Sequence, residues 1–327
     1  MCAESMSAEP SDFSIPDFSA IEAAARRIAP WIATPPVLRS ESLDALAGAE
    51  LLFKCENLQR VGAFKFRGAC NAVWSLSDAD ARHGVVTHSS GNHGAALALA
   101  ARTRAIPAHV VVPEGAVPSK VAAIEAYGAS LHRCAPTLAA RDALSDEVRA
   151  ATGASLIHPY TDPRVIAGQG TAALEMIRSD GPFDALLTPV GGGGLIGGTA
   201  IVAAALLPAA KLFAAEPEGA ADALLSLQRG ELVTDLVLNT ICDGLRALTG
   251  PINFELLQRH AVTVLPVSDS EVIAAMRLLW THLRIIVEPS SATVLAAVLR
   301  HRDAFAGRRV GIILSGGNVD LDKLPWQ

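Results

Sequence analysis

Residues 184–206 read DALLTPVGGGGLIGGTAIVAAAL, and much of the fold follows from this stretch. An apolar run at 184–188 has the length of a buried strand, and residues 195–206 have the composition of a buried helix. Between them, Gly191–Gly194 leave successive backbone N–H groups free to converge on an anion. The helix N-terminus adds the positive end of its dipole. The sequence therefore predicts a phosphate site where this strand ends.

The same order of strand, turn and helix recurs along the chain. Predicted strands are 50–55, 85–87, 109–112, 131–134, 184–188, 212–215 and 310–314. Predicted helices are 21–28, 63–76, 95–102, 119–127, 138–151, 195–206, 221–227, 269–283 and 290–299. This rhythm is typical of parallel sheets covered by helices. We predict an α/β protein of two lobes, with its ligand at the carboxyl ends of the strands.

Composition excludes several classes of protein. Half of the 327 residues are apolar and 18% are charged, which indicates a folded globular chain with room for two lobes. A net charge of −6 argues against a nucleic-acid partner. The uncharged stretch 185–210 is broken by glycines and prolines, which argues against a membrane span. Five cysteines without a C-x-x-C pair, and a start at 1–12 without a signal-peptide pattern, predict a cytoplasmic protein.

Lys65 stands between two aromatic residues, Phe64 and Phe66. A surface lysine whose stem packs on rings is the simplest explanation. Partial desolvation by the rings would instead lower its pKa and make the amine a nucleophile and a base. Ser315 ends the strand 310–314 and offers a hydroxyl. An amine for a Schiff base, N–H groups for a phosphate and a hydroxyl for a ring nitrogen together match the needs of pyridoxal phosphate.

The polar turn 89–94, SSGNHG, joins a predicted strand to a predicted helix. Its hydroxyl and N–H groups suit a substrate carboxylate, and ordinary helix capping explains them equally well. His93 alone is more typical of a structural residue. A dinucleotide site at Gly191–Gly194 is the alternative there, since Glu216 lies at a suitable distance downstream. That alternative leaves Lys65 and Ser315 unexplained.

Five ordered motifs resemble the fold-type-II pyridoxal-phosphate enzymes, which are tryptophan synthase β-like. Within them, the chain is most similar to the group of serine racemase and the short threonine (serine) dehydratases. The motifs are FKFRGA at 64–69, THSSGNHG at 87–94, VIAGQGT at 165–171, PVGGGG at 189–194 and LSGGNVD at 314–320. The resemblance implies a large cofactor-binding domain of residues 1–83 and 162–327. It also implies a small, mobile domain of residues 84–161.

The resemblance also implies roles for single residues. Lys65 would hold the cofactor covalently and remove the α-proton of the substrate. The other expected cofactor contacts are Phe64 beside the ring, Asn92 at the ring hydroxyl, Gly191, Gly192, Gly193 and Gly194 at the phosphate, and Ser315 at the ring nitrogen. The expected ligands of the substrate carboxylate are Ser89, Ser90, Asn92 and His93. In a racemase, Ser90 would be the acid and base on the opposite face.

Two further alignments concern a metal and the substrate side chain. Glu216, Ala220 and Asp222 align with a divalent-cation site, and their hard oxygen ligands suit Mg²⁺, Ca²⁺ or Mn²⁺. Arg141 aligns with an arginine that reaches acidic ligands, although a solvated helix residue is the alternative. The family resemblance also implies a homodimer.

We expect α,β-elimination of water from a 3-hydroxy amino acid such as L-threonine or L-serine, giving a 2-oxo acid and ammonia. Racemisation of serine and dehydration of 3-hydroxyaspartate are the alternatives. Ala63, Ala95 and Tyr160 depart from common residues of the family and leave the side-chain preference open. A regulatory protein on the same fold is an interpretation from another class, because fold does not fix function. The intact Lys65 and Ser315 argue against it.

Overall fold

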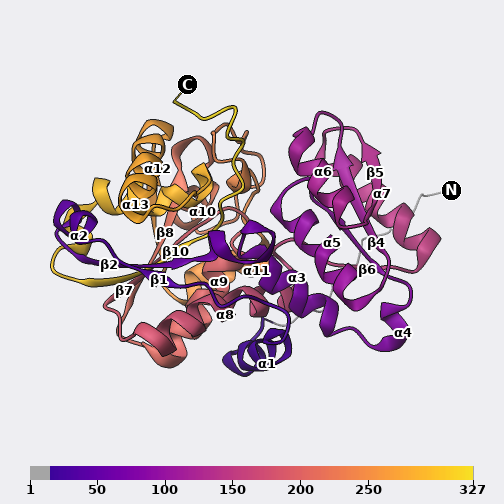
Figure 1. Ribbon diagram of the computed structural model, residues 1–327, viewed down its shortest axis with the longest axis horizontal. Helices are drawn as coiled ribbons and strands as arrows, with labels where there is room; N and C mark the ends of the chain where they lie inside the picture. Colours follow the sequence, from indigo (N-terminus) through magenta and orange to yellow (C-terminus); the bar gives the residue numbers. More distant parts are fainter. Residues whose placement is uncertain (1–14, 327) are drawn as a thin grey trace.

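The computed structural model describes residues 15–326, in two lobes that each hold a sheet (Figure 1). Residues 1–12, which lack a signal-peptide pattern, lie outside the described residues. The large lobe has the strand order β1 (Val37–Leu38), β2 (Glu50–Cys55), β10 (Arg309–Leu314), β7 (Ala185–Pro189), β8 (Lys211–Pro217), β9 (Thr263–Val267). The small lobe has the order β5 (Ser130–Cys134), β4 (Ala108–Pro113), β3 (Val85–His88), β6 (Ser155–Leu156). All pairings are parallel except β1 with β2, so the predicted α/β architecture is confirmed.

The sheet of the large lobe is buried on both faces. Helices α8 (Pro163–Asp180) and α9 (Gly194–Leu206) cover one face, while α12 (Asp269–Leu283) and α13 (Pro289–Arg300) cover the other (Figure 1). Its central strands β7 and β10 are apolar except for Thr188 and Arg309, as expected for parallel strands covered twice. Successive residues of β10 point to opposite faces of the sheet, so Ile312 is buried in one hydrophobic core and Ile313 in the other.

The small lobe repeats this layering on a smaller scale. Helix α5 (Asn92–Arg104) packs on Val110 and Val112 of β4, together with α6 (Pro118–Ala126). Helix α7 (Leu138–Thr152) covers the other face, where Val86 and Val111 are buried. The alternation of the valines between the two faces follows from the two-residue period of a strand.

The remaining helices connect or flank these layers. They are α1 (Phe18–Ile28), α2 (Glu41–Ala47), α3 (Lys65–Trp74), α4 (Asp78–Ala81), α10 (Asp222–Arg229), α11 (Pro251–Arg259) and α14 (Arg302–Phe305). Every strand and helix predicted from the sequence is present, with ends displaced by up to three residues. The elements that were not predicted are β1, α2, α4, β6, α8, α11, β9 and α14.

Helices α3 and α8 approach each other closely. A Cβ atom on Gly168 would lie 2.6 Å from the Cα of Gly68, so a larger residue at Gly168 is excluded. The Gln169 side chain accepts a hydrogen bond of 3.1 Å from the Gly68 N–H. The VIAGQGT motif is therefore a packing motif, and it fixes the helix that begins at Lys65.

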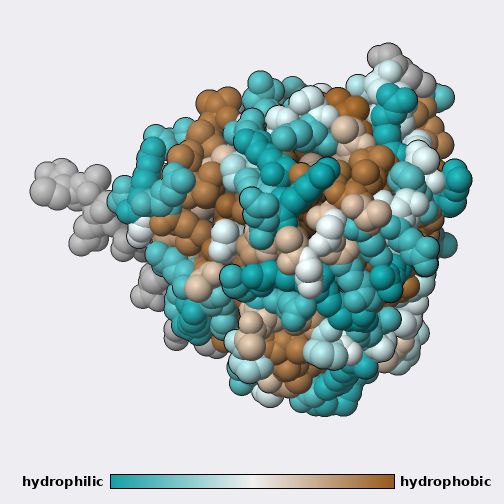
Figure 2. Space-filling model, turned by 90° about the vertical axis from the view of Figure 1, so that its left-hand side faces the viewer, coloured by the Kyte–Doolittle hydropathy of each residue, from teal (hydrophilic) through white to brown (hydrophobic). Residues whose placement is uncertain are grey.

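The surface at the outer end of the large lobe mixes apolar and polar side chains (Figure 2). Among residues 15–326, no helix has the length and apolar composition needed to cross a membrane. Four cysteines of this range are buried free thiols, namely Cys55, Cys70, Cys134 and Cys242.

Candidate active site

Backbone hydrogen bonds join the start of α3 to the end of β10. The Phe64 N–H donates to the carbonyl of Ser315 at 2.9 Å, and the Gly317 N–H donates to the carbonyl of Gly62 at 2.9 Å. Ser315 is 3% exposed. Two segments from opposite ends of the sequence therefore place Lys65 and Ser315 on the same wall of the site.

The amine of Lys65 is largely removed from water. Its Nζ donates to the carbonyl of Pro159 at 3.0 Å and lies 5.2 Å from the ring centre of Phe64. Burial lowers the pKa of Lys65 to about 8, although the nearby Glu288 carboxylate opposes the shift. Phe66 is instead buried in the core between α3 and α5, so only Phe64 of the two flanking rings lies over the amine.

The glycine run follows β7 and opens α9, as the sequence predicts. Gly193 has φ of 92°, a left-handed conformation that favours glycine. A Cβ atom on Gly192 would lie 2.3 Å from the Tyr160 ring, so a side chain there has no room. Within residues 15–326, the four N–H groups of Gly191–Gly194 donate to no protein acceptor. Buried N–H groups beside a helix N-terminus are suited to a phosphate.

The turn before α5 does not cap its helix. Gly91 is the N-cap residue, and no side chain accepts a hydrogen bond from the first turn there. Ser89 and Ser90 are half-buried in the turn, and the amide of Asn92 faces the large lobe. Burial lowers the pKa of His93 well below its ordinary value, so this ring is neutral. The capping explanation is thus not supported, and the turn remains available to a substrate.

These groups fit pyridoxal phosphate. The unpaired N–H groups of the glycine run match a phosphate, the amine of Lys65 matches an aldehyde, and the Ser315 hydroxyl matches a ring nitrogen. The pKa of about 8 leaves part of the Lys65 amine neutral near pH 7, as a nucleophile requires.

A histidine cluster that the sequence did not suggest lies beside Lys65. The ring centre of His158 is 5.1 Å from that of His88 and 4.6 Å from that of Tyr160. Burial lowers the pKa of His158 to about 3, and His88 and Lys65 lower it further in the same direction. His158 is therefore a neutral ring. The one sequence signal for this cluster was that His88 directly precedes Ser89, the first residue of the polar turn.

Arg141 lies in the first turn of α7, next to the histidine cluster. Its Nε is buried and finds no hydrogen-bond acceptor in the part of the chain that the structure describes. Its positive charge contributes to lowering the pKa of His88, although burial of His88 is the larger cause. Asp142 Oδ1 is 3.7 Å from His88 Nε2 and is mostly exposed. A buried guanidinium N–H without an acceptor suggests a place for an acidic ligand.

Glu216, Ala220 and Asp222 are all buried at the carboxyl end of β8. Glu216 accepts hydrogen bonds from the N–H groups of Ala223 and Leu224, at 2.8 and 3.0 Å. Asp222 Oδ2 accepts from the Thr249 N–H at 2.7 Å, while Oδ1 has no partner among the described residues. Burial raises the pKa of Glu216 to about 8. Burial also raises the pKa of Asp222 above its ordinary value. Two adjacent buried carboxyls that form no salt bridge within residues 15–326 are suited to a divalent ion.

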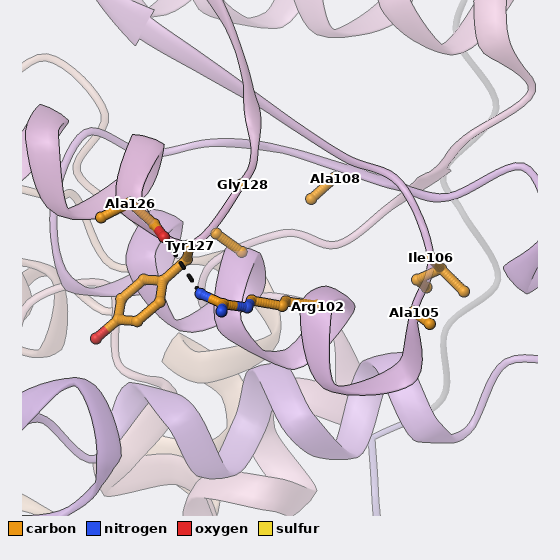
Figure 3. Close-up of a pocket in the computed structure, with 8 residues that line it drawn as sticks. Arg102, Ala105, Ile106, Ala108, Ala126, Tyr127 and Gly128 are labelled. Carbon is orange, nitrogen blue, oxygen red and sulfur yellow. Dashed lines mark hydrogen bonds between the residues drawn. The ribbon is translucent and has the colours of Figure 1, made fainter.

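A separate pocket of about 430 Å³ lies on the small lobe, beside α5 and the end of α6 (Figure 3). Arg102 is the one charged residue that lines it, and its guanidinium donates to the carbonyl of Ala126 at 3.3 Å. None of the predicted site residues lines this pocket.

Known proteins resemble the chain over almost its whole length. The family described as "Pyridoxal-phosphate dependent enzyme" matches residues 28–316. The beta-hydroxyaspartate dehydratase of Paracoccus denitrificans is 46% identical over 312 residues, which are 95% of this chain and 99% of that protein. The structure of maize serine racemase has a TM-score of 0.92 at 42% identity and covers 94% of this chain and 95% of its own. The structure of serine racemase from Dictyostelium discoideum has a TM-score of 0.89 at 48% identity and covers 93% and 98%.

Proposed function

The chain belongs to the family of pyridoxal-phosphate dependent enzymes, as an ammonia-lyase or racemase acting on amino acids, and we propose that it dehydrates 3-hydroxyaspartate. The observation that carries this choice is the buried Nε of Arg141, which lacks an acceptor in the described part of the chain. L-Serine and L-threonine have no second carboxylate for it. The 46% identity to a protein named beta-hydroxyaspartate dehydratase supports the same choice.

In this proposal the residues of the site divide substrate binding and proton transfer between them. The α-carboxylate binds at the turn formed by Ser89, Ser90, Asn92 and His93, and the second carboxylate binds Arg141. The cofactor, when bound, draws electrons from the α-carbon. The Lys65 amine then removes the α-proton. Loss of the β-hydroxyl as water, and hydrolysis of the released enamine, give a four-carbon 2-oxo dicarboxylic acid and ammonia.

The cofactor contacts follow the same geometry. Gly191–Gly194 would donate to the phosphate and Ser315 would bind the ring nitrogen, while Phe64 would pack beside the ring. A hydroxyl opposite the ring nitrogen can donate a hydrogen bond to it without adding charge. Asn92 would bind the ring hydroxyl.

Replacing Arg141 by alanine is expected to raise KM for 3-hydroxyaspartate about 10- to 100-fold, the loss of one charge-assisted hydrogen bond. KM for L-serine should stay within about twofold, because serine has no group at that position. Steady-state kinetics with both substrates measure the difference. Arg149→Ala is the control, since Arg149 lies on the same helix and pairs with the exposed Asp146. Equal effects on both substrates would overturn the assignment of Arg141.

The lowered pKa of Lys65 predicts how the apoenzyme takes up its cofactor. Only the neutral amine attacks an aldehyde, so the rate of reconstitution should rise with pH and level off above about pH 8. With a lysine of ordinary pKa, the rate of reconstitution would continue to rise up to about pH 10.4. Stopped-flow absorbance of apoenzyme mixed with pyridoxal phosphate measures the rate, and a continuous rise to about pH 10 would contradict the desolvated amine.

We also propose that Glu216, Asp222 and the carbonyl of Ala220 bind Mg²⁺, or Ca²⁺ or Mn²⁺ in its place. Chelation of the ion should then lower the melting temperature by several degrees, because an ion at 100 times its Kd stabilises the fold by about 2.7 kcal/mol. Differential scanning fluorimetry with and without Mg²⁺ measures this shift.

Two variants separate this site from general ion effects. Glu216→Gln should abolish the Mg²⁺-dependent shift. Glu218→Gln should retain it, since Glu218 is partly exposed and pairs with Arg300. A shift that survives in Glu216→Gln, or an absence of any shift in the natural protein, would refute the metal site.

Some expectations extend beyond the site itself. We propose that residues 84–161 form a small, mobile domain that closes on a large domain of 1–83 and 162–327. We further propose a cytoplasmic homodimer without a nucleic-acid or membrane partner.

Serine racemisation is the second candidate activity, supported by the 42% identity to maize serine racemase. It would use Ser90 as the acid and base opposite Lys65.

A further inference from the structure

Glu288 is a buried carboxylate that its own helix does not use. It occupies the N-cap position of α13, yet its side chain accepts no hydrogen bond from the first turn. It is only 2% exposed. Burial raises the pKa of Glu288 to about 7, and the Asp243 carboxylate adds to the shift, whereas Lys120 opposes it. A buried carboxylate is unfavourable unless hydrogen-bond donors compensate for the lost water. The groups that donate to Glu288 therefore indicate its role.

Three hydrogen bonds from two asparagines reach the Glu288 carboxylate. The Asn92 Nδ2 donates to Oε1 at 3.0 Å and to Oε2 at 3.2 Å. The backbone N–H of Asn318 donates to Oε2 at 3.2 Å. Asn92 belongs to the small lobe, while Glu288 and Asn318 belong to the large lobe. The contact therefore bridges the two lobes.

The amide of Asn92 is held at both ends. The nitrogen of Asn92 faces Glu288, and this orientation suits the ionised carboxylate, which only accepts hydrogen bonds. The oxygen of Asn92 accepts from the side chain of Asn318 at 3.0 Å, which itself is fixed by a hydrogen bond of 2.8 Å to the carbonyl of Val61. The orientation of the amide follows from these partners. One N–H of Asn92 is left for a further acceptor.

Glu288 also borders the proposed cofactor position. A Cβ atom on Gly316, the residue after Ser315, would lie 2.7 Å from Glu288 Oε1. The Glu288 charge is near enough to Lys65 to raise its pKa against the effect of burial. The carboxylate thus lies beside both proposed cofactor contacts, Lys65 and Ser315.

We propose that Glu288 is a positioning residue, which holds the Asn92 amide so that its remaining N–H donates to the ring hydroxyl oxygen of the cofactor. The inference rests on the proposed role of Asn92. With the amide reversed, its oxygen would face the ring oxygen, and the two acceptors would repel each other. Glu288 therefore acts through Asn92 and does not touch the reacting atoms.

Glu288→Gln tests this proposal at constant side-chain length. Asn92 Nδ2 and the Asn318 N–H both need an acceptor at position 288. A glutamine offers only one oxygen, and its NH₂ group would face one of these two donors. We expect the affinity of the apoenzyme for pyridoxal phosphate to fall about tenfold. The absorption band of the bound cofactor should shift in the same direction as in Asn92→Ala. Glu271→Gln is the control, because Glu271 caps α12 and pairs with Arg300.

The double variant Glu288→Gln/Asn92→Ala decides whether Glu288 acts through Asn92. Its affinity should equal that of Asn92→Ala alone, because the positioned amide is already absent. Additive losses would overturn the proposal. A shifted band in Asn92→Ala with an unchanged band in Glu288→Gln would also overturn it, while leaving the role of Asn92 intact. No effect of Asn92→Ala would refute the role of Asn92 itself.

Glu288→Asp provides a second variant if the glutamine variant does not fold. Aspartate keeps the charge and withdraws it from Asn92 by one methylene. The same loss of affinity and the same band shift are expected, because the shorter side chain no longer reaches the Asn92 amide although it keeps its charge. An aspartate variant that matches the natural protein in both measurements would overturn the proposal.

Discussion

Lys65→Ala is expected to lower turnover of every substrate by about four orders of magnitude or more. The amine is both the covalent anchor of the cofactor and the base for the α-proton, and a positioned base alone contributes about 10²- to 10⁴-fold. Of the other four lysines among the described residues, Lys54 pairs with Glu175 and Lys120 with Asp243, while Lys211 and Lys323 are exposed. The initial rate of 2-oxo acid formation measures the loss.

A matched control separates this effect from general damage. Lys211→Ala should retain full activity, because Lys211 is exposed at the start of β8. Thermal unfolding of the Lys65→Ala apoenzyme should resemble that of the natural apoenzyme. Turnover within tenfold of the natural protein in Lys65→Ala would disprove the assignment of the base and anchor.

Arg67→Ala is expected to destabilise the fold by about 3–5 kcal/mol, the usual cost of removing one partner of a buried ion pair. Arg67 is fully buried, and its donors reach Glu56 at 2.7 and 2.8 Å, Glu175 at 2.8 and 2.7 Å, and the Thr171 hydroxyl at 3.1 Å. The alanine variant would leave the Glu56 carboxylate, itself fully buried, without its cation. Urea unfolding of the apoenzyme at neutral pH measures the loss.

An exposed arginine with similar partners gives the comparison. Arg300 also contacts two glutamates, Glu218 and Glu271, but near the surface. Arg300→Ala should cost less than about 1 kcal/mol, because water replaces the lost partners. If Arg67→Ala and Arg300→Ala lost equal free energy of unfolding, burial of the ion pairs would not explain the cost of removing Arg67.

The layers of the fold were predictable because strand and helix patterns alternate cleanly from 184 to 206 and from 85 to 151. Helix α8 was missed because its small residues were interpreted only as a motif. Gly170 is small for a tertiary reason, since a Cβ atom there would lie 2.9 Å from the carbonyl oxygen of Gly198 on α9. Strand β9 was missed because Pro266 interrupts its apolar run.

The candidate site was predictable only where chemistry marks the sequence. Lys65, the glycine run and Ser315 stand out because each follows or begins a regular element with an unusual residue type. Glu288 does not stand out, since a glutamate before Pro289 looks like an ordinary helix start. Its partner Asn92 is 196 residues away in the chain, and only the packing of the two lobes brings them together.

Side-by-side turnover tests the central proposal most directly. The purified holoenzyme with Mg²⁺ would receive both diastereomers of 3-hydroxyaspartate, L-serine, D-serine and L-threonine, with 2-oxo acid and the opposite enantiomer scored together. We predict 2-oxo dicarboxylic acid from one diastereomer, with kcat/KM about 10- to 100-fold above that for L-serine, and no opposite enantiomer. Formation of D-serine from L-serine as the main reaction, with no oxo acid from either hydroxyaspartate, would contradict the proposal and identify a racemase.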